Sequence, residues 1–238
     1  TYWTEITEGQ PIGTIYGYKT DGIVQLGEDL SGIPFFAGKT LRHGDRKYVN
    51  KNDDNVINEE DLFILGNANP DFTLGFNNTF NFKLRNNSSL GLTVYLQGAV
   101  GNEIVNFNKF SLESFDGYKN NSTAALNRWT PDNPTNLYPR ATTKTAGNIL
   151  SDHYVEDGSY LRIKDITLSY TFPANIIKKF YCEGLTIFAG LKNIHTFTDY
   201  SGYDPEVSRF ANNNLSMGAD YGSYPMSKSY EFGLRMNF

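Results

Sequence analysis

The sequence predicts an all-β fold of about six antiparallel, up-and-down transmembrane β-strands that belong to a β-barrel. Three observations lead to this prediction. Apolar and polar residues alternate along several runs that are long for strands, and the connections between these runs are either very long or very short. Aromatic residues make up 15% of the 238 residues, yet the mean hydropathy is only −0.45. Alternating strands keep the average hydropathy of a membrane barrel low in this way.

The clearest strand is predicted over residues 72–84. Its apolar face carries Phe72, Leu74, Phe76, Phe80, Phe82 and Leu84, and its polar face carries Thr73, Gly75, Asn77, Thr79, Asn81 and Lys83. Successive side chains of a strand point to opposite faces, so this alternation indicates a strand with one apolar and one polar face. Turn-forming residues at 86–89 and a second alternating run at 90–97 follow, and the two runs are expected to form a hairpin.

The period of two recurs in three later runs, over residues 165–172, 185–192 and 230–238. The last run has an apolar face of Tyr230, Phe232, Leu234, Met236 and Phe238. A less regular strand is expected over residues 12–24. Six strands cannot close a barrel, because single-chain barrels begin at about eight strands. We therefore expect further strands upstream of Thr1, where the chain starts without a Met.

The connections between the predicted strands are asymmetric. Three are long, at about residues 25–70, 105–153 and 199–226, and two are short, near 85–89 and 174–183. In up-and-down order the long connections fall on one side of the sheet and the short ones on the other. Bacterial outer-membrane barrels pair long extracellular loops with short periplasmic turns in this way. The alternative is a soluble extracellular β-sandwich that binds carbohydrate or calcium.

Composition excludes several classes of function. The 21 basic and 26 acidic residues give a net charge of −5, which argues against a nucleic-acid partner. A single cysteine, Cys182, cannot form an intrachain disulfide or a multi-cysteine metal site. His43, His153 and His195 lie far apart, and no nucleophile or nucleotide motif is present. We therefore predict no catalytic residues and no enzyme activity.

One polar stretch, residues 50–61, resembles a twelve-residue calcium loop. In that register the ligands are Asn50, Asn52, Asp54, the Val56 carbonyl and Asp61. Asn50 replaces the usual first carboxylate, and Asn55 replaces the usual glycine, although Asn tolerates positive φ better than most residues. The sequence thus predicts a Ca²⁺ ion that braces the first long loop. The alternative is a polar loop whose Asx-turns hold the same shape without metal.

Several blocks together resemble the TonB-linked outer-membrane proteins of the SusC/RagA type. The blocks are residues 9–18 (GQPIGTIYGY), 44–58 (GDRKYVNKNDDNVIN), 98–106 (GAVGNEIVN), 155–164 (VEDGSYLRIK) and the terminal strand ending in Phe238. They cover nearly the whole chain in one order. The resemblance implies that residues 1–238 are the C-terminal part of a TonB-dependent receptor-type β-barrel, with the plug domain and upstream strands outside this chain.

The resemblance also implies a function. It implies a component of a transporter in the bacterial outer membrane, of the Bacteroidetes type, that imports oligosaccharides or peptides. Its partners would be the rest of the barrel and plug, membrane lipid, a SusD-like surface lipoprotein, and TonB through the absent N-terminal part. The apolar residues Tyr230, Phe232, Leu234, Met236 and Phe238 resemble a C-terminal barrel-assembly signal. The transported substrate and its binding residues stay unknown at this point.

Two further groups of residues are candidates for contact with substrate or partner. Polar residues expected to face the lumen are Thr73, Asn77, Asn81, Tyr95, Gln97, Arg235 and Asn237. Loop aromatics that could stack on sugar rings or pack on a lid are Phe107, Phe110, Phe115, Tyr118, Trp129, Tyr203 and Tyr221. Tyr170, Phe172, Tyr230 and Phe238 suit the aromatic girdles of a membrane barrel.

Overall fold

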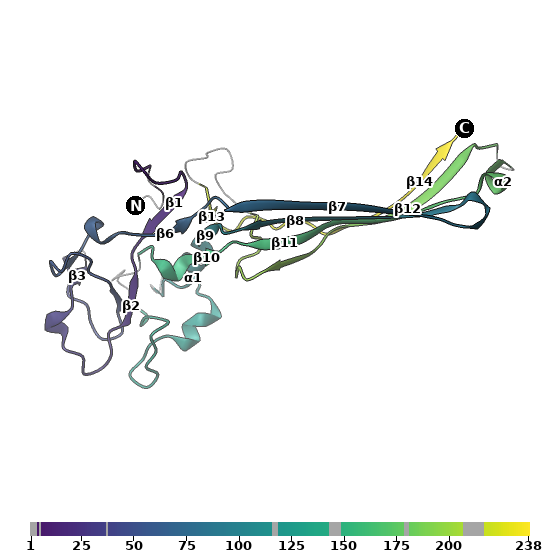
Figure 1. Ribbon diagram of the computed structural model, residues 1–238. Coiled ribbons are helices and arrows are strands. Elements are labelled where there is room, and N and C mark those ends of the chain that lie inside the picture. The colour runs from purple at the N-terminus through teal and green to yellow at the C-terminus, as the bar shows by residue number, and fades with distance from the viewer. Residues whose placement is uncertain are drawn as a thin grey trace. The chain divides into compact units, whose positions relative to one another are not determined.

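The computed structural model describes residues 4, 6–36, 38–115, 119–142, 149–178, 181–206 and 217–238. The chain divides into two compact units. Unit one comprises Thr1–Asn69, Asn102–Asp157 and Ser201–Ser223, and unit two comprises Pro70–Gly101, Gly158–Tyr200 and Tyr224–Phe238. Strands predominate and helices are few and short, which confirms the mainly β prediction (Figure 1). No helix in the described part of the chain is both long and apolar enough to cross a membrane.

Unit two is a five-stranded antiparallel sheet in the order β14-β12-β11-β8-β7. Its strands are β7 (Phe72–Lys83), β8 (Ser89–Val100), β11 (Tyr160–Thr171), β12 (Gly184–Thr198) and β14 (Ser229–Asn237). Each strand pairs with the one that precedes or follows it among these five, so the up-and-down arrangement is confirmed. Four of them have 12 to 15 residues. A tilted membrane-spanning strand needs about 9–11.

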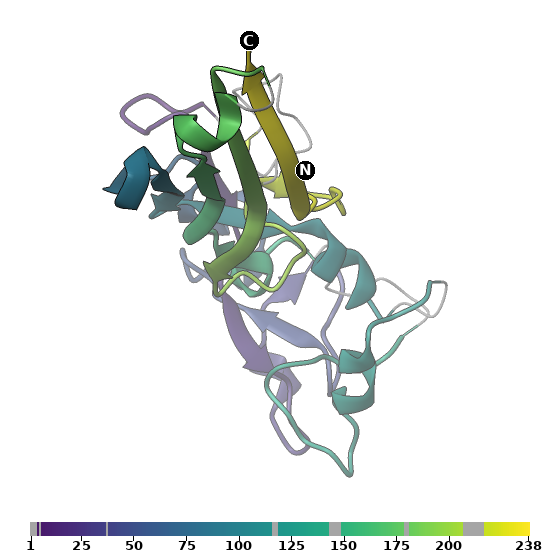
Figure 2. The same cartoon turned by 90° about the vertical axis from the view of Figure 1, so that its right-hand side faces the viewer.

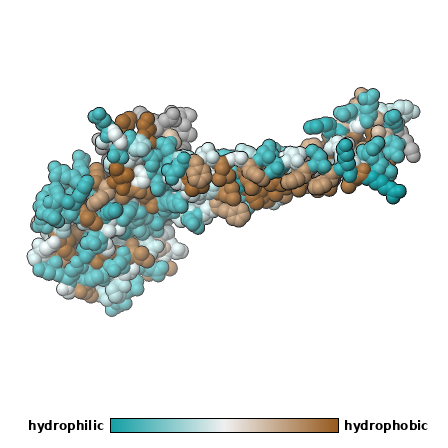
Figure 3. Space-filling view, viewed as in Figure 1, coloured by the Kyte–Doolittle hydropathy of each residue, from teal (hydrophilic) through white to brown (hydrophobic). Residues whose placement is uncertain are grey.

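The strand register separates the side chains of unit two into an apolar and a polar face. One row across all five strands consists of Phe80, Leu92, Leu168, Ala189 and Phe232. The neighbouring row consists of Thr79, Thr93, Thr167, Gly190 and Glu231. Side chains in adjacent rows point to opposite faces. Figure 3 shows hydrophobic residues gathered along the strands of this sheet.

A bulge in β11 keeps this separation intact. Leu161 and Ile163 lie on the apolar face, and Ile166 and Leu168 continue it, so the alternation changes phase between them. The register shifts between Ile163 and Asp165 against both β8 and β12. Lys164 is therefore the extra residue, and without it every apolar side chain beyond it would point to the polar face.

The short connections lie at the same end of the strands, as predicted. The β7–β8 turn contains the 3₁₀ segment η3 (Arg85–Asn87), in which Asn86 and Asn87 adopt φ of 62° and 60°. The β11–β12 connection contains the short helix α2 (Ala174–Ile177), which begins after Pro173. Asn237 of β14 pairs with Gly184 at the start of β12, so the chain also ends at this end of the strands. Figures 1 and 2 show α2 and the C-terminus at this end of the sheet.

The predicted strand over residues 12–24 is wrong as a sixth strand of the sheet. This segment instead forms β1 (Thr14–Gly17) and β2 (Thr20–Ile23), which pair with β6 (Phe63–Asn67) and β4 (Arg46–Tyr48) in unit one. Gly13, which precedes β1, has φ of 87°, and Gly22, inside β2, has φ of 77°, where the pairing of β2 with β4 shifts register. The run breaks at Tyr18 and Lys19, where the backbone of Tyr18 pairs with Leu150 and Asp152 instead of continuing either strand. In the described part of the chain, the long-stranded sheet therefore has five strands.

Unit one is built from short elements and small clusters of apolar side chains. Its other strands are β3 (Phe35–Phe36), β5 (Val56–Ile57), β9 (Glu103–Asn106), β10 (Val155–Asp157) and β13 (Ala219–Asp220). Its helical segments are α1 (Phe107–Leu112), η1 (Leu30–Gly32), η2 (Glu59–Asp61), η4 (Thr123–Asn127) and η5 (Asp152–Tyr154). Three clusters of buried residues centre on Ile15, Tyr48 and Val24. All three lie in unit one.

The apolar face of unit two is exposed. Phe72, Phe76 and Phe82 retain 56%, 53% and 52% of their accessible surface, and Phe232 retains 80%. A β-sandwich would bury these side chains against a second sheet. The five strands of unit two form a single sheet, and its apolar face is open. The exposed band is the arrangement expected for a membrane barrel rather than for a sandwich core.

Candidate functional site

The long connections of unit one meet at the carboxylate of Glu156, on β10. Oε1 accepts hydrogen bonds from Oγ of Ser201 at 2.9 Å and from Nδ2 of Asn106 at 3.3 Å. Nζ of Lys109 lies 3.3 Å from the same oxygen. Oε2 accepts from the backbone N of Ser201 at 2.9 Å. One carboxylate therefore ties the connection after β8 to the connection after β12.

Glu113 and His153 form a second polar pair beside this junction. Nε2 of His153 lies 2.8 Å from Oε2 of Glu113, and Nζ of Lys109 donates to the backbone oxygen of His153 at 2.9 Å. Burial lowers the pKa of His153 and outweighs the opposing effect of Glu113. The folded protein therefore favours the neutral imidazole, and protonation of His153 destabilises this region as pH falls through about 6.5.

A hollow of about 460 Å³ opens where these segments come together. Its lining residues come from three stretches of unit one: Asn106, Asn108, Lys109, Leu112 and Glu113; Ser122 and Tyr138; and Ser201, Gly202 and Tyr203. The volume lies in the range of roughly 300–1,000 Å³ that is common for small-molecule sites. The lining combines amides, hydroxyls and tyrosine rings with charged groups that already have partners within the protein.

The predicted calcium loop is held in shape by its own side chains. Nitrogen atoms of Lys51 and Asn58 donate to the fully buried Asp61 carboxylate at 2.7 and 2.8 Å. The backbone N of Asp54 donates to Oδ1 of Asn52, and the backbone N of Val56 donates to Oδ1 of Asp54. These Asx-turns form the polar-loop arrangement that the sequence leaves as the alternative to a metal.

The donor set of this loop nevertheless suits a hard cation. Asn55 adopts φ of 66° at the position where a calcium loop usually has glycine, so the sharp turn is present. Oδ1 of Asn50 is shielded from solvent and has no hydrogen-bond partner among the described residues. Across the described ranges, no group of three or more His, Cys, Asp or Glu side chains gathers as a metal site. The possible ligands are therefore mainly amide and backbone oxygens, with two carboxylates.

The structure places the predicted lumen-facing residues on one face. Register puts Thr73, Asn77, Asn81, Tyr95, Gln97, Arg235 and Asn237 together on the polar side of the sheet. On this face the ring of Phe188 covers Gly233, where a Cβ atom would lie 2.4 Å from the ring. Hydroxyl pairs such as Thr79–Thr93, at 3.2 Å, cross the strands. The face is mainly polar, with Phe188 and Ala99 as apolar members, but whether it lines water stays a prediction.

The predicted loop aromatics separate into packed and exposed residues. Phe107 stacks on Tyr221 with ring centroids 4.3 Å apart, and Phe110 meets Tyr154 edge-on at 5.1 Å. Phe115 and Trp129 are 1% and 5% exposed, so they stabilise unit one. Tyr203, which is 75% exposed at the polar hollow, is the aromatic residue best placed to meet a ligand. Tyr118 lies outside the described residues.

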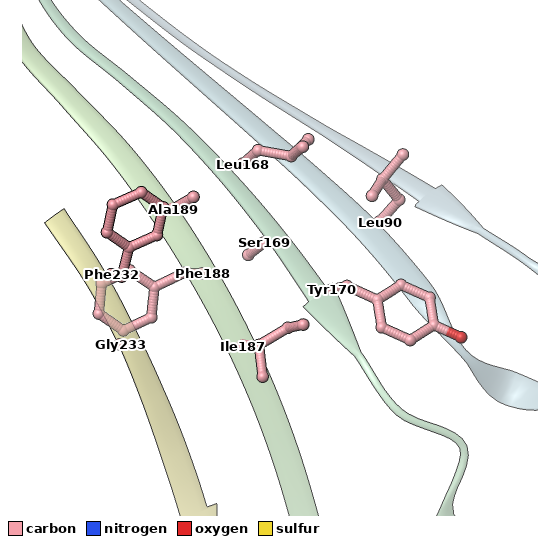
Figure 4. Close-up of a pocket in the computed structure, with 9 residues that line it drawn as sticks. All are labelled: Leu90, Leu168, Ser169, Tyr170, Ile187, Phe188, Ala189, Phe232 and Gly233. Atoms are coloured by element: carbon pink, nitrogen blue, oxygen red, sulfur yellow. The ribbon is translucent and has the colours of Figure 1, made fainter. Parts of the chain in front are cut away.

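A second hollow, of about 320 Å³, lies on the sheet of unit two (Figure 4). Six of its nine lining residues belong to the apolar face: Leu90, Leu168, Tyr170, Ile187, Ala189 and Phe232. Figure 4 shows these side chains spread over neighbouring strands, with Ala189 between larger residues. This hollow is a depression in an apolar surface and offers almost no polar group to a ligand.

The sequence did not identify Glu156, Lys109, Asn108 or Ser201 as site residues. These residues lie up to about a hundred positions apart and show no local spacing that would connect them. The parallel pairing of β13 with β9, which brings Ala219 against Val105, is equally non-local. Only the block at 155–164 and the Asn at 106 hinted, through the family resemblance, that this region is distinctive.

We predict that Glu156→Gln loosens the junction and changes its pH dependence. Burial raises the pKa of Glu156, but hydrogen bonds from Ser201 and the charge of Lys109 outweigh it and leave the pKa below its ordinary value. The stabilisation is therefore complete above about pH 4.3 and is lost as pH falls through the lower folded pKa. Because hydrogen bonds to charged groups contribute about 1.5–3 kcal/mol, local opening should become easier by about that amount.

Hydrogen exchange of the amides at residues 201–206 measures this effect. The wild type should lose protection in acid, whereas Glu156→Gln should show weaker protection already at neutral pH. Glu28→Gln is the matched control, since Glu28 pairs with Lys47 at 2.6 Å elsewhere in unit one. Equal protection in both variants would show that the Glu156 contacts do not hold the junction.

Comparison with known proteins identifies what this chain resembles. No protein-family model matches it. TonB-dependent receptor P3 of Formosa agariphila is 33% identical over 237 residues, which are 98% of this chain and 23% of that protein. TonB-dependent receptor P26 of the same organism is also 33% identical, over 99% of this chain and 23% of its own length. The chain thus spans about a quarter of the length of these relatives.

Two further matches carry family names. TonB-dependent receptor SusC of Bacteroides thetaiotaomicron is 26% identical over 200 residues, 80% of this chain and 17% of that protein. The RagAB peptide importer in its open-open state has the same fold, with a TM-score of 0.69 and 20% identity over 99% of this chain and 25% of that chain. These matches are to receptors and importers, which agrees with the prediction that the protein is not an enzyme. The chain matches the C-terminal portion of a SusC/RagA-like TonB-dependent receptor.

Proposed function

We propose that this chain is the membrane-embedded and loop-bearing part of a TonB-dependent importer in a bacterial outer membrane. The observation that carries the proposal is the two-faced sheet of unit two. Its five strands present a continuous, exposed apolar face on one side and a polar face on the other. Lipid contact on the apolar face and water on the polar face account for both.

The edges of the sheet support a larger barrel. β7 and β14 each pair on one side only in the described sheet. Unpaired backbone groups cost several kcal/mol each in hydrocarbon, so an open edge is not stable in a membrane. Strands from the rest of the protein would close the sheet into a barrel on both sides.

The partners and cargo follow from the same assignment. The long connections of unit one would face the cell exterior and the short turns at η3 and α2 the periplasm. A SusD-like lipoprotein would cover the exterior side, and TonB would act through parts of the protein outside this chain. The solved neighbours are named a peptide importer, and another relative is named SusC. The first name supports peptides as one class of cargo, and the oligosaccharides that the family resemblance implies stay the other proposed class.

We predict opposite effects for lysine on the two faces. Phe76→Lys places a charge on the apolar face and should destabilise the barrel by about 2–4 kcal/mol near the bilayer midplane. Asn77→Lys places the same charge on the polar face and should be tolerated. The measurement is the amount of folded, heat-modifiable full-length protein in the outer-membrane fraction.

The two variants also separate the proposal from a soluble sandwich. A protein that is found folded in the soluble fraction, or that assembles equally well with either lysine, would contradict a lipid-facing role for Phe76. Asn77→Lys is a matched control because it is the adjacent residue of the same strand and introduces the same side chain.

We further propose that the barrel-assembly machinery recognises the C-terminal end of β14 as an assembly signal. Tyr230, Phe232, Leu234 and Met236 lie on the apolar side of this edge strand, Phe238 follows its last residue, and all five are 42–83% exposed. Exposed backbone and aromatic side chains at a free edge suit recognition by strand addition.

Deleting Phe238 alone should therefore slow outer-membrane assembly, as measured by pulse-chase folding. Phe238→Tyr should behave like the wild type, and normal assembly of the deletion would refute the role.

We propose, finally, that residues 50–61 bind Ca²⁺ through Asn50, Asn52, Asp54, Val56 and Asp61. The turn geometry and the unpartnered Oδ1 of Asn50 support this assignment. When bound, the ion would neutralise the two carboxylates and fix the loop. Extracellular calcium modules bind with Kd of about 10⁻⁴–10⁻³ M, so about 10 mM Ca²⁺ should stabilise unit one by roughly 1.4–2.7 kcal/mol.

Asp53 and Asp54 provide a charge-matched test of the calcium site. Asp54→Ala removes a proposed ligand and should abolish the rise in melting temperature that Ca²⁺ causes. Asp53→Asn removes the same charge at a residue outside the ligand positions, and Asn readily adopts the φ of 59° found there. A Ca²⁺ response that is absent in the wild type, or that Mg²⁺ reproduces fully, would contradict a calcium site.

A further inference from the structure

Two hollows adjoin on the apolar face of unit two, towards the end of the strands where the short connections lie. The first is the hollow of about 320 Å³ described above (Figure 4). The second, of about 290 Å³, lies under α2 and is lined by Phe172, Ile176, Ile177, Cys182, Leu185 and Met236. We propose that the two hollows together bind one acyl chain of an anionic phospholipid, with the phosphate at Lys178. The proposal rests on the membrane-embedded importer function proposed above and assigns to it a specific lipid site.

The two hollows follow one another along β12. Ile187 lines the first and Leu185 the second, and these are successive side chains on the same face of the strand. From Ala189 to Leu185 the strand advances by roughly 14 Å, at about 3.4 Å per residue. The hydrocarbon layer of one leaflet is about 15 Å thick, half of the whole bilayer core. The hollows therefore extend over about the length of one acyl chain in one leaflet.

The first hollow is recessed because a small residue lies among large ones. Ala189 belongs to the row that also contains Phe80, Leu92, Leu168 and Phe232, all of which have much larger side chains. Figure 4 shows Ala189 between larger side chains, with the ring of Phe232 beside it. A flexible chain of methylene groups can fill such a recess, whereas a flat protein surface would leave it empty and lose the packing contacts. The shape therefore favours a lipid chain over a protein partner.

The connection that carries α2 suits the boundary between hydrocarbon and head groups. Ile177 and Cys182 are 3% and 6% exposed, so they hold this connection against the strands. Ile176 also lines the second hollow but retains 47% of its surface, and Tyr181 is 94% exposed. Tyrosine is enriched where the hydrocarbon core meets the polar head groups. A lipid whose chain lies in the hollows would have its head group at this connection.

The charges of the short connections favour an anionic head group. Lys178 is exposed and directly follows Ile177, which lines the second hollow. The sequences of the two short connections contain Arg85, Lys178 and Lys179 but only one acidic residue, Glu183, although the whole chain has a net charge of −5. Lysine binds phosphate through charge-assisted hydrogen bonds, and basic residues beside a membrane attract anionic lipids. We therefore expect phosphatidylglycerol to bind more tightly than zwitterionic phosphatidylethanolamine.

Native mass spectrometry of the purified full-length receptor tests the proposal. The receptor in detergent is mixed with phosphatidylglycerol and phosphatidylethanolamine that carry the same acyl chains, and the retained lipids are counted. At the lowest lipid ratios the wild type should retain a single phosphatidylglycerol. Ala189→Phe fills the recess and should weaken retention of both lipids about tenfold, the loss expected when about two methylene groups are excluded. Lys178→Gln should still retain lipid but should lose the preference for phosphatidylglycerol.

Matched variants show whether these effects are local. Val94→Phe adds a phenylalanine to the same apolar face outside the lining of both hollows, and Lys39→Gln removes an exposed lysine of unit one. Both should retain phosphatidylglycerol as the wild type does. Ala189→Leu fills the recess with a smaller side chain and replaces Ala189→Phe if that variant does not assemble.

Four results would overturn the proposal. The first is unchanged retention in the variants that fill the recess, and the second is an equal loss in Val94→Phe. The third is a head-group preference that Lys178→Gln leaves unchanged. The fourth is a wild type that retains phosphatidylethanolamine or lipid A as strongly as phosphatidylglycerol.

Failure of this site can be distinguished from failure of the importer function. If Phe76→Lys impairs outer-membrane assembly while Ala189→Phe retains phosphatidylglycerol as the wild type does, the importer function holds and the lipid site fails. If the protein is found folded in the soluble fraction but loses bound phosphatidylglycerol in Ala189→Phe, the lipid site holds and the importer function fails.

Discussion

A single hydrogen-bond register runs through the five strands of unit two, and the placement of every side chain there depends on it. The pairs Phe80–Leu92 and Ala189–Phe232 belong to one row, although their strands lie far apart in the sequence. A slip of one residue in any pairing would exchange the apolar and polar faces of that strand. The extra residue at Lys164 shows how strictly the separation is kept, since the chain accepts an interrupted ladder in β11 to preserve it. The same register places both short turns and the chain end at one end of the strands. The long connections therefore leave from the opposite end.

Much of this register could be predicted because it follows from local alternation. Residues 72–84 alternate except at Asn78, residues 90–97 alternate throughout, and the structure has the two runs as neighbouring antiparallel strands. The start of β11 could not be predicted in the same way. The phase change at Lys164 hides Leu161 and Ile163 from a search for period two, so the strand was expected only from residue 165. Residues 12–24 show the opposite error, because apolar residues there suggest one strand, whereas the chain leaves the first pairing at Tyr18, which bonds to Leu150 and Asp152.

The candidate site was less predictable for a physical reason. Glu156, Asn106 and Ser201 meet through tertiary contacts, and their separation in the sequence carries no periodic pattern. The predicted loop aromatics illustrate the same limit. Trp129 is buried and donates a hydrogen bond to Oε1 of Gln25 at 3.0 Å, whereas Tyr203 is exposed. In the sequence both are simply aromatic residues in long loops, and nothing distinguishes them. Whether an aromatic residue packs or binds depends on what covers it, and that is decided by the fold of the whole loop.

Unit one shows how long connections can hold a fixed shape with little apolar core. Its three clusters of buried residues are small. Buried carboxylates also stabilise the loops, because they accept hydrogen bonds from backbone N–H groups. Asp61 accepts from Lys51 and Asn58, and Asp220 accepts from Gly222 and Ser223. Hydrogen bonds to an ionised acceptor are roughly twice as strong as neutral ones, and each also satisfies a backbone donor that a loop would otherwise leave unpaired. Loops built in this way can expose tyrosines such as Tyr203 without losing the contacts that position the backbone. The polar hollow is the place in unit one where that arrangement leaves a shielded amide donor, Nδ2 of Asn108, beside an exposed ring.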